Sequence, residues 1–301
     1  MIITRNYTND NGRECRLKCR CSDDIMMVRR VTKMVDTESK HLYDEETEKI
    51  VDGLTLFDDD LMSLVFDENI PATELVLRII LGRAIKVISV EGQEEMKNPI
   101  IGGRNITLDV HAIDVDGQHI DIEVQGDSAG AHVRRARFHS SMMDARMLKE
   151  NEKFKSLTDS YVIFIYKHDK FGKGLPLYHI DRYVRETEEL FEDGSHIIYV
   201  NGKYKGDDEI GMLMEDFGST KSSKIHFAEL ADGIKHFKET EEGRDIMCEK
   251  VKKYGDKKAL QAKLETVCNL METMKLTLEQ ALDALKITGK ERTAIVGQLQ
   301  K

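Results

Sequence analysis

The side chains best suited to chemistry lie in one stretch, residues 105–125, which reads NITLDVHAIDVDGQHIDIEVQ. Hydrophobic residues alternate with polar ones on both sides of a central Asp-Gly pair, which predicts two strands joined by a tight turn. A two-residue turn at that pair would place Asp109 opposite a valine and mix the two faces. A three-residue loop, Val115–Gly117 with the glycine left-handed, instead pairs Asp109 with Glu123 and keeps the apolar residues on one side.

In that register Asp109 and Glu123 are cross-strand neighbours, with Cβ atoms about 4.5–5.5 Å apart, and Gln125 lies on the same face. Opposed carboxylates repel each other unless a cation neutralises them, and Mg²⁺ is usually held by one or two carboxylates with water and substrate phosphates. Such an ion activates a bound water and stabilises charge on a phosphodiester. The same pattern also fits a solvated polar face on an amphipathic hairpin, with His111 and Asp121 as a surface pair.

A basic stretch follows the hairpin. Residues 126–155 carry seven Lys or Arg and four Asp or Glu, in a chain whose net charge is −10. Arg134 and Arg137 are one turn apart on the predicted helix and can share a face. Arginine near a metal site is suited to hold phosphate through paired hydrogen bonds. The alternative is an ordinary solvated helix face with local ion pairs.

The elements that must position these residues follow from periodicity. Before residue 228, helices are predicted over residues 54–65, 72–84 and 131–149. Strands are predicted over Ile85–Val90, Ile106–Ile113, Ile120–Val124, Tyr161–Tyr166, Leu177–Ile180 and His196–Val200. Beyond Ala228 the chain is predicted to be helical, with a capping box from Thr277 to Gln280. This order predicts a mixed α/β core rather than a regularly alternating doubly wound sheet.

Composition limits the class of protein. A chain of 301 residues with 40% hydrophobic and 33% charged residues is typical of one or two globular domains. We expect a polar N-terminal appendage over residues 1–50, the chemistry-bearing domain over 51–227 and a helical region over 228–301. Five cysteines are too few for a disulfide framework, and the sequence shows neither a membrane-spanning run nor a hydrophobic signal region. These features lead us to expect a cytoplasmic protein without membrane contact.

The string LDVHAIDVDGQHIDIEVQ, residues 108–125, resembles the motif LDVxAxDxxGxxxxIEVQ of the PD-(D/E)XK nuclease superfamily. The branch it resembles is that of the nuclease family transposases and recombination-promoting nucleases. Further landmarks occur in the family's order: LTLFDDDLMSLVFDENIPATELVLRIILGRAIKV, Gln93, Arg104, RRARFHSSMMDARML, YVIFIYKHDKFGKGLPLY, IIYVNGKY and MCEKV. Because these separated motifs agree, the resemblance covers about residues 52–250.

The resemblance implies a restriction-endonuclease-like core, a mixed sheet flanked by helices, that cleaves DNA with Mg²⁺ or, in its place, Mn²⁺. By motif position, it implies that Asp109 and Glu123 are metal ligands and catalytic residues. It also implies a carboxylate from the first core helix, for which Glu74 is the first candidate and Glu68 the second.

Two positions depart from the superfamily or the branch. Gln125 stands where the wider superfamily has a catalytic lysine, so it would orient the attacking water or a phosphate oxygen by hydrogen bonds rather than by charge. The branch usually has two aromatic residues at positions 138 and 139, whereas this chain has Phe138 and His139.

The leading hypothesis is therefore a metal-dependent DNA endonuclease, with Arg134 and Arg137 on the backbone phosphates. Low sequence specificity is expected because no groove-reading helix with its own basic arm is evident. The family name adds a link to recombination or transposition. DNA is the expected partner, and the C-terminal helices either pack on the protein's own core or support a homo-oligomer. The alternative is a weakly active or inactive DNA- or protein-binding module on the same fold, which Gln125 and the net charge of −10 favour.

Overall fold

The computed structural model describes residues 3–8, 14–19, 43, 45–127 and 130–299. The chain divides into two compact units, Met1–Glu48 and Lys49–Lys301. In the first unit, β1 (Ile3–Thr8) pairs antiparallel with β2 (Glu14–Cys19). The predicted domain boundaries at residues 50 and 227 stay predictions.

The second unit is built on a mixed sheet. Within the described residues the sheet has six strands, in the order β3 (Val87–Met96), β4 (Ile106–Asp114), β5 (His119–Gln125), β6 (Ser160–Tyr166), β10 (Ser195–Asn201) and β7 (Leu177–Ile180). The three strands β5, β6 and β10 run parallel, and β3, β4 and β7 are antiparallel to their neighbours. A small hairpin of β8 (Tyr183–Val184) and β9 (Glu189–Leu190) forms a separate sheet. The predicted mixed α/β class is confirmed.

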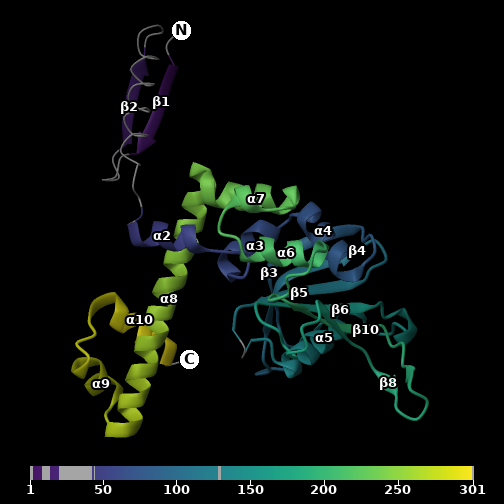
Figure 1. Cartoon of the computed structure of the whole chain (residues 1–301). Coiled ribbons are helices and arrows are strands. Elements are labelled where there is room, and N and C mark those ends of the chain that lie inside the picture. The colour runs from purple at the N-terminus through teal and green to yellow at the C-terminus, as the bar shows by residue number, and fades with distance from the viewer. Residues whose placement is uncertain (1–2, 9–13, 20–42, 44, 128–129, 300–301) are drawn as a thin grey trace. The chain divides into compact units, whose positions relative to one another are not determined.

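Helices cover both faces of this sheet (Figure 1). Helices α3 (Asp59–Phe66) and α4 (Ile70–Leu81) lie against β3, and α6 (Glu209–Gly218) packs on α4. Helix α5 (Val133–Met147) lies on the other side, against β6 and β10. A strand covered on both faces is buried at every position, and β5 is buried at its five central residues.

Local sequence explains where α4 begins and ends. The Asn69 side chain accepts a hydrogen bond from Ala72 N–H at 3.2 Å, and Pro71 lies in the first turn, where its missing N–H is not needed. Gly82 ends the helix in the left-handed conformation, with φ of 66°.

The β4–β5 hairpin has the predicted register and loop. Val110 pairs with Ile122 and His111 with Asp121. Asp114 N–H donates to Gln118 O, which leaves the three residues 115–117 in the loop, and Gly117 has the left-handed φ of 75°. The alternating pattern and the glycine together were sufficient to predict this register.

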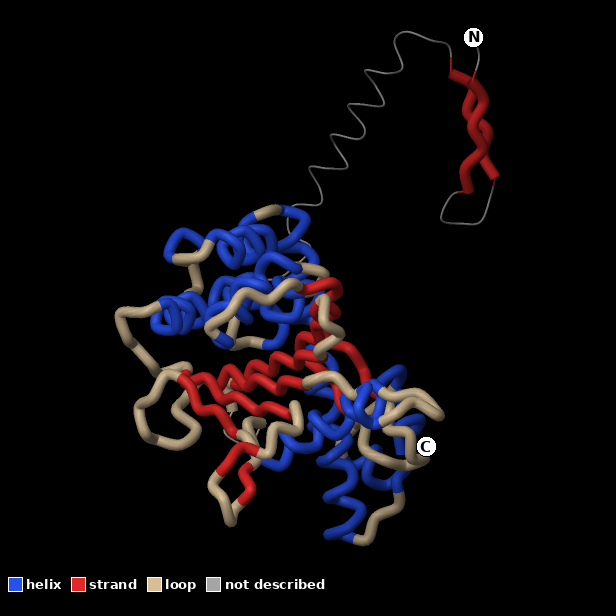
Figure 2. The backbone as a smooth tube through the Cα atoms, turned by 90° about the vertical axis from the view of Figure 1, so that its right-hand side faces the viewer, coloured by secondary structure: helices blue, strands red, loops and turns tan. Residues whose placement is uncertain are grey.

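The C-terminal region is helical, as predicted. It contains α7 (Ala228–Glu239), α8 (Glu241–Met274), α9 (Leu278–Ala284) and α10 (Gly289–Leu299). Thr277 and Gln280 form the predicted capping box at the start of α9. The C-terminal helical segments lie side by side (Figure 2). Near its end, α8 shares a separate small core with the segments that follow it, centred on Val267, Ala281, Leu282, Ile287 and Ile295. None of the helices in the described part of the chain is both long and apolar enough to cross a membrane.

Some elements differ from the sequence-based expectation. Strand β3 continues to Met96, six residues beyond the predicted end at Val90. Its second half is polar, and its pairing with β4 rather than hydrophobic alternation defines it. Neither α2 (Glu45–Gly53) nor the β8–β9 hairpin was predicted.

Candidate active site

Asp109 and Glu123 are held beside each other by backbone hydrogen bonds across the hairpin. Asp109 N–H donates to Glu123 Oε1 at 3.1 Å, and Asp109 Oδ2 accepts from Val124 N–H at 3.0 Å. The other carboxylate oxygen, Asp109 Oδ1, has Gln93 Nε2 at 3.5 Å. Each carboxylate is thus fixed by the backbone of the opposite strand, which confines both to one place.

The polar face of the hairpin is buried, so its interpretation as a solvated surface is wrong. Asp121 and Glu123 have no exposed surface, and Asp109 and His111 are buried as well. The physical reason is that α5 covers this face, a tertiary contact that hydrophobic alternation cannot reveal.

His111 and Asp121 do not form the surface pair considered above. They face each other in the strand register, yet each has other partners. His111 pairs with Glu94 at 2.5 Å and contacts His119 Nδ1 at 3.0 Å. Asp121 instead binds His139 of α5.

Helix α5 places two cationic or titratable side chains on the carboxylates. Arg135 donates to Glu123 Oε2 and, at 3.2 Å, to Gly130 O. His139 Nδ1 lies 2.9 Å from Asp121 Oδ2 and 3.5 Å from Glu123 Oε1. Because Arg135 Nε–H donates to His139 Nε2 at 3.3 Å, the imidazole proton sits on Nδ1 and is donated to Asp121.

Sequence reasoning missed Arg135 and His139, although their spacing carried a signal. They are four residues apart and therefore share one face of α5, which is the face turned to β5. The sequence contains two adjacent arginines, and choosing between Arg134 and Arg135 required the rotational phase of the helix relative to the sheet.

The buried carboxylates carry more negative charge than their surroundings neutralise. Burial raises the pKa of Asp109 well above its usual value, and the charges of Glu123 and Asp59 add to the shift. Burial likewise raises the pKa of Asp121, and burial with the neighbouring charge of Asp121 raises the pKa of Glu123 to about 8. Burial lowers the pKa of His139, so the imidazole adds little positive charge. The cluster therefore needs either bound protons or a bound cation.

The residues present fit a divalent ion. Asp121, Glu123 and His139 each offer a ligand atom within 4.8 Å of the other two. In the described part of the chain, Asp121 Oδ1 is buried without a hydrogen-bond partner, which is unfavourable unless a cation binds it. The donor set and the unneutralised charge both suit a cation at this face of the hairpin.

Metal-free protein is expected to lose stability as the pH rises. A pKa raised from its ordinary 4.5 to about 8 means that folded Glu123 binds a proton more tightly than unfolded Glu123 does. The contribution of Glu123 protonation to the free energy of unfolding is therefore complete below about pH 4.5 and disappears as the pH rises to about 8. Urea denaturation in EDTA at several pH values measures it, and Glu123→Gln should flatten the dependence. If the free energy of unfolding of Glu123→Gln depends on pH as steeply as that of the wild type, Glu123 is not the group responsible.

A cleft of about 850 Å³ opens in front of Asp109. Four of its lining residues within the described structure are arginines, namely Arg104, Arg134, Arg135 and Arg137. Arg134 and Arg137, which the sequence predicted, are exposed at its wall, whereas Arg135 reaches inward to Glu123. The cleft thus combines a carboxylate floor with guanidinium groups, the arrangement needed to bring a phosphate to a metal ion.

Gln125 ends β5 and is partly exposed. Its Oε1 lies where a side chain on residue 130 would be, since a Cβ added to Gly130 would come within 1.6 Å of it. Gly130 is therefore required for the amide to take this place. Gln125 also lines a neighbouring hollow together with Asp59.

Asp59, rather than Glu74, brings a helical carboxylate to the cleft. Asp59 lines the cleft, and its charge adds to the shift of Asp109. Glu74 instead accepts from Val87 N–H at 2.9 Å and pairs with Lys86. Val87 pairs with Asp114 at the loop end of β4, about 16 Å along the strand from Asp109.

Glu68, the second candidate, follows α3 with a left-handed backbone, and its side chain is exposed. It is not among the residues that line the cleft. The aspartate run at the start of α3, residues 58–60, was the sequence signal that pointed to the helix-borne carboxylate actually present.

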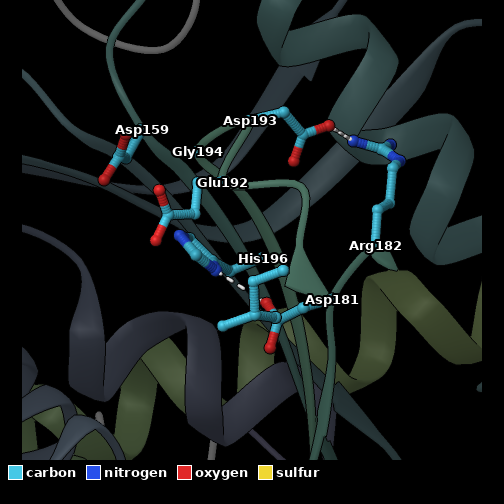
Figure 3. A pocket seen from close by; sticks show the side chains of 8 residues that line it. Asp159, Asp181, Arg182, Glu192, Asp193, Gly194 and His196 are labelled. Atoms are coloured by element: carbon cyan, nitrogen blue, oxygen red, sulfur yellow. Dashed lines mark hydrogen bonds and ion pairs between the residues drawn. The ribbon is translucent and has the colours of Figure 1, made fainter. Parts of the chain in front are cut away.

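A second hollow of about 300 Å³ lies beside the β8–β9 hairpin (Figure 3). Its two basic side chains are both engaged: His196 contacts Asp181 at 2.9 Å, and Arg182 pairs with Asp193. Two further acids, Asp159 and Glu192, line the same hollow. Figure 3 shows both pairs within the hollow. With its cations already engaged, this hollow has less capacity for a phosphate than the arginine-lined cleft.

The mixed sheet flanked by helices is consistent with a PD-(D/E)XK nuclease-like domain. Residues 73–205 match the family described as PD-(D/E)XK nuclease family transposase. The matched segment runs from within α4 to just beyond β10 and contains the hairpin and α5. The match confirms the resemblance inferred from the sequence motifs and supports a nuclease- or transposase-related role. Neither a curated protein nor a solved structure matches the chain.

Proposed function

We propose that this protein is a divalent-metal-dependent DNA endonuclease that hydrolyses phosphodiesters in the arginine-lined cleft. The observation that carries the proposal is the backbone-locked pair of Asp109 and Glu123 beside a cleft with four arginines on its described walls. Buried carboxylates that one arginine neutralises only in part are unfavourable for stability, and a function that requires a cation explains why they are there.

In this proposal Asp109 and Glu123 hold the metal, with Mg²⁺ as the working ion and Mn²⁺ as a substitute. A bound ion supplies an activated water and stabilises the charge that develops at phosphorus. Gln125 orients the attacking water through its amide. Asp59 takes the place proposed for Glu74, because it is the helical carboxylate that lines the cleft.

The proposal is tested with purified full-length protein and supercoiled plasmid. Nicked and then linear DNA should appear with Mg²⁺ or Mn²⁺, and EDTA should stop the reaction. Substrates of unrelated sequence should be cut at similar rates if specificity is low. Folded protein that cuts with neither metal would overturn the proposal and favour the DNA- or protein-binding alternative.

Arg134 and Arg137 should act in binding rather than in the chemical step. The double variant Arg134→Ala/Arg137→Ala is expected to weaken duplex binding about tenfold at physiological salt, because each arginine neutralises one phosphate. The slope of log affinity against log salt should fall in magnitude by about two. Fluorescence anisotropy in EDTA measures both, without cleavage.

Arg185→Ala is the matched control for that pair, because Arg185 is exposed near the β8–β9 hairpin and does not line the cleft. It should leave both the affinity and the salt slope unchanged. An equal loss in the control and the double variant would show that net charge, rather than the cleft, determines binding.

The same proposal includes a cytoplasmic location, a role in recombination or transposition and a homo-oligomer through the C-terminal helices. The small core of α8, α9 and α10 already buries Val267 and Ile295 within one chain. An oligomer would therefore use the outer surfaces of these helices. Light scattering of the full-length protein distinguishes a monomer from an oligomer.

A further inference from the structure

We propose that Asp121, Glu123 and His139 form a buried binding site for a first-row divalent transition-metal ion, separate from the cleft-facing position at Asp109. The inference rests on the proposed function in one respect, because Glu123 would serve both positions. The three ligand atoms lie within 4.8 Å of one another. One imidazole with two carboxylates suits a transition metal better than Mg²⁺ or Ca²⁺, which favour oxygen ligands alone.

A second, independent observation is the buried Asp121 oxygen that lacks a partner. Asp121 Oδ2 accepts from His139, but no N–H of a described residue donates to Oδ1, and the side chain has no exposed surface. Desolvation of a carboxylate oxygen is unfavourable unless a donor or a cation compensates it. An ion ligated by Asp121 supplies that compensation.

The burial of the three ligand side chains also favours some metal ions over others. Asp121 and Glu123 side chains are 0% exposed and that of His139 is 3% exposed. Mg²⁺ gives up its water reluctantly and usually keeps several bound waters. Ligands that have almost no contact with solvent do not readily accommodate these waters, so an ion that accepts protein ligands directly is favoured.

Binding at His139 is coupled to Arg135. In the structure the imidazole proton is on Nδ1, and Nε2 accepts from Arg135 Nε–H at 3.3 Å. A metal on Nδ1 moves that proton to Nε2, which can then no longer accept. Arg135 must therefore release His139, and an ion bound to Glu123 would compete with the guanidinium for that carboxylate. The cleft that Arg135 already lines can receive the displaced side chain. Arg135 thus acts as the cation of the metal-free state.

Mn²⁺ is the probe, because its unpaired electrons report directly bound nitrogen. Pulsed electron paramagnetic resonance of the full-length protein with one equivalent of Mn²⁺ and no DNA should show ¹⁴N coupling from a coordinated imidazole. The coupling should persist in excess Mg²⁺ and disappear when Zn²⁺, which binds N and O ligands more tightly than Mn²⁺, is added.

His139→Phe should abolish the ¹⁴N coupling and weaken Mn²⁺ binding about tenfold or more. The matched control is His132→Asn, because His132 also lines the cleft and asparagine preserves a cap for α5. The control should retain the coupling. If His139→Phe does not fold, Asp121→Asn serves instead, since asparagine keeps the acceptor for His139 while removing the charged ligand, and it too should lower Mn²⁺ affinity.

The outcomes separate this inference from the proposed function. Absence of ¹⁴N coupling in the wild type, or its persistence in His139→Phe, overturns the buried site even if plasmid is cleaved. Coupling that depends on His139 in a protein that cuts no DNA supports the buried site and overturns the endonuclease proposal alone.

Discussion

Replacing Asp109 by asparagine is expected to reduce metal-dependent plasmid cleavage about a thousandfold or more while leaving the protein folded. In the proposed mechanism the carboxylate is one of two groups that hold the metal at the cleft. Loss of about 4 kcal/mol of transition-state stabilisation corresponds to that factor, at about 1.4 kcal/mol per tenfold. Initial rates of nicking with Mg²⁺ and with Mn²⁺ measure the effect.

The stability of this variant should move in the opposite direction from its activity. Asparagine has nearly the same shape, and its carbonyl oxygen can still accept from Val124 N–H, as Asp109 Oδ2 does. The substitution also removes a buried carboxyl group whose pKa is raised by burial and by the charge of Glu123. The melting temperature in EDTA should therefore be unchanged or higher, which excludes unfolding as the cause of inactivity.

Asp116→Asn is the control within the same hairpin. Asp116 lies in the exposed loop, and its substitution removes one negative charge without touching the cleft. It should cleave at the wild-type rate. Wild-type activity in Asp109→Asn would remove this carboxylate from the metal site and with it the main support for the endonuclease.

The second large effect is expected from Arg135→Met, and it concerns stability. Arg135 is the partner of the fully buried Glu123, and breaking a buried ion pair by removing one member typically costs 3–5 kcal/mol. The Arg135 side chain is 32% exposed, which lowers our expectation to about 2–3 kcal/mol. Urea denaturation in EDTA at pH 8 measures the loss.

Two conditions should reduce that loss. At pH 6 it should be smaller, because the pKa of Glu123 is raised to about 8 and a bound proton replaces the missing positive charge. Mn²⁺ should restore stability more strongly than in the wild type, since the ion no longer competes with Arg135 for Glu123. Stability in the variant that does not respond to Mn²⁺ would contradict the idea that guanidinium and metal occupy the same carboxylate.

Arg137→Met provides the comparison, because Arg137 is exposed at the cleft wall. Its substitution should change stability by less than about 0.5 kcal/mol, as is usual for surface positions. If both variants lose equal stability, the ion pair with Glu123 is not the source of the effect.

Short-range information in the sequence was sufficient for the hairpin and for several elements around it. The alternation of apolar residues and the glycine at position 117 determined the loop, and the loop determined that Asp109 lies opposite Glu123. The run Tyr161–Tyr166 specified a buried strand, which the structure places in β6. The capping box at Thr277 marked a helix start. Each of these features depends on residues close together in the chain.

The chemical surroundings of Asp109 and Glu123 depend instead on residues brought together by packing. Nothing in the alternation of the hairpin shows that α5 covers its polar face, and so the solvated interpretation remained open until the burial of Asp121 and Glu123 was seen. For the same reason the predicted helical carboxylates were Glu74 and Glu68 and did not include Asp59. The direction of each helix relative to β4 decides which acid reaches the cleft.

The sequence by itself thus determined the pair of opposed carboxylates, the basic segment after them and the mixed α/β class. Only the tertiary structure decided that Arg135 contacts Glu123 and that His139 contacts Asp121. Arg134 and Arg137, which were predicted to bind phosphate, are exposed at the cleft wall. The reason is physical: strand register follows from local turn geometry, whereas the rotation of α5 about its axis is set by packing of Ala136, Met142 and Met143 against β4 and β6. That rotation turns one of two adjacent arginines toward the buried charge and leaves the other in solvent.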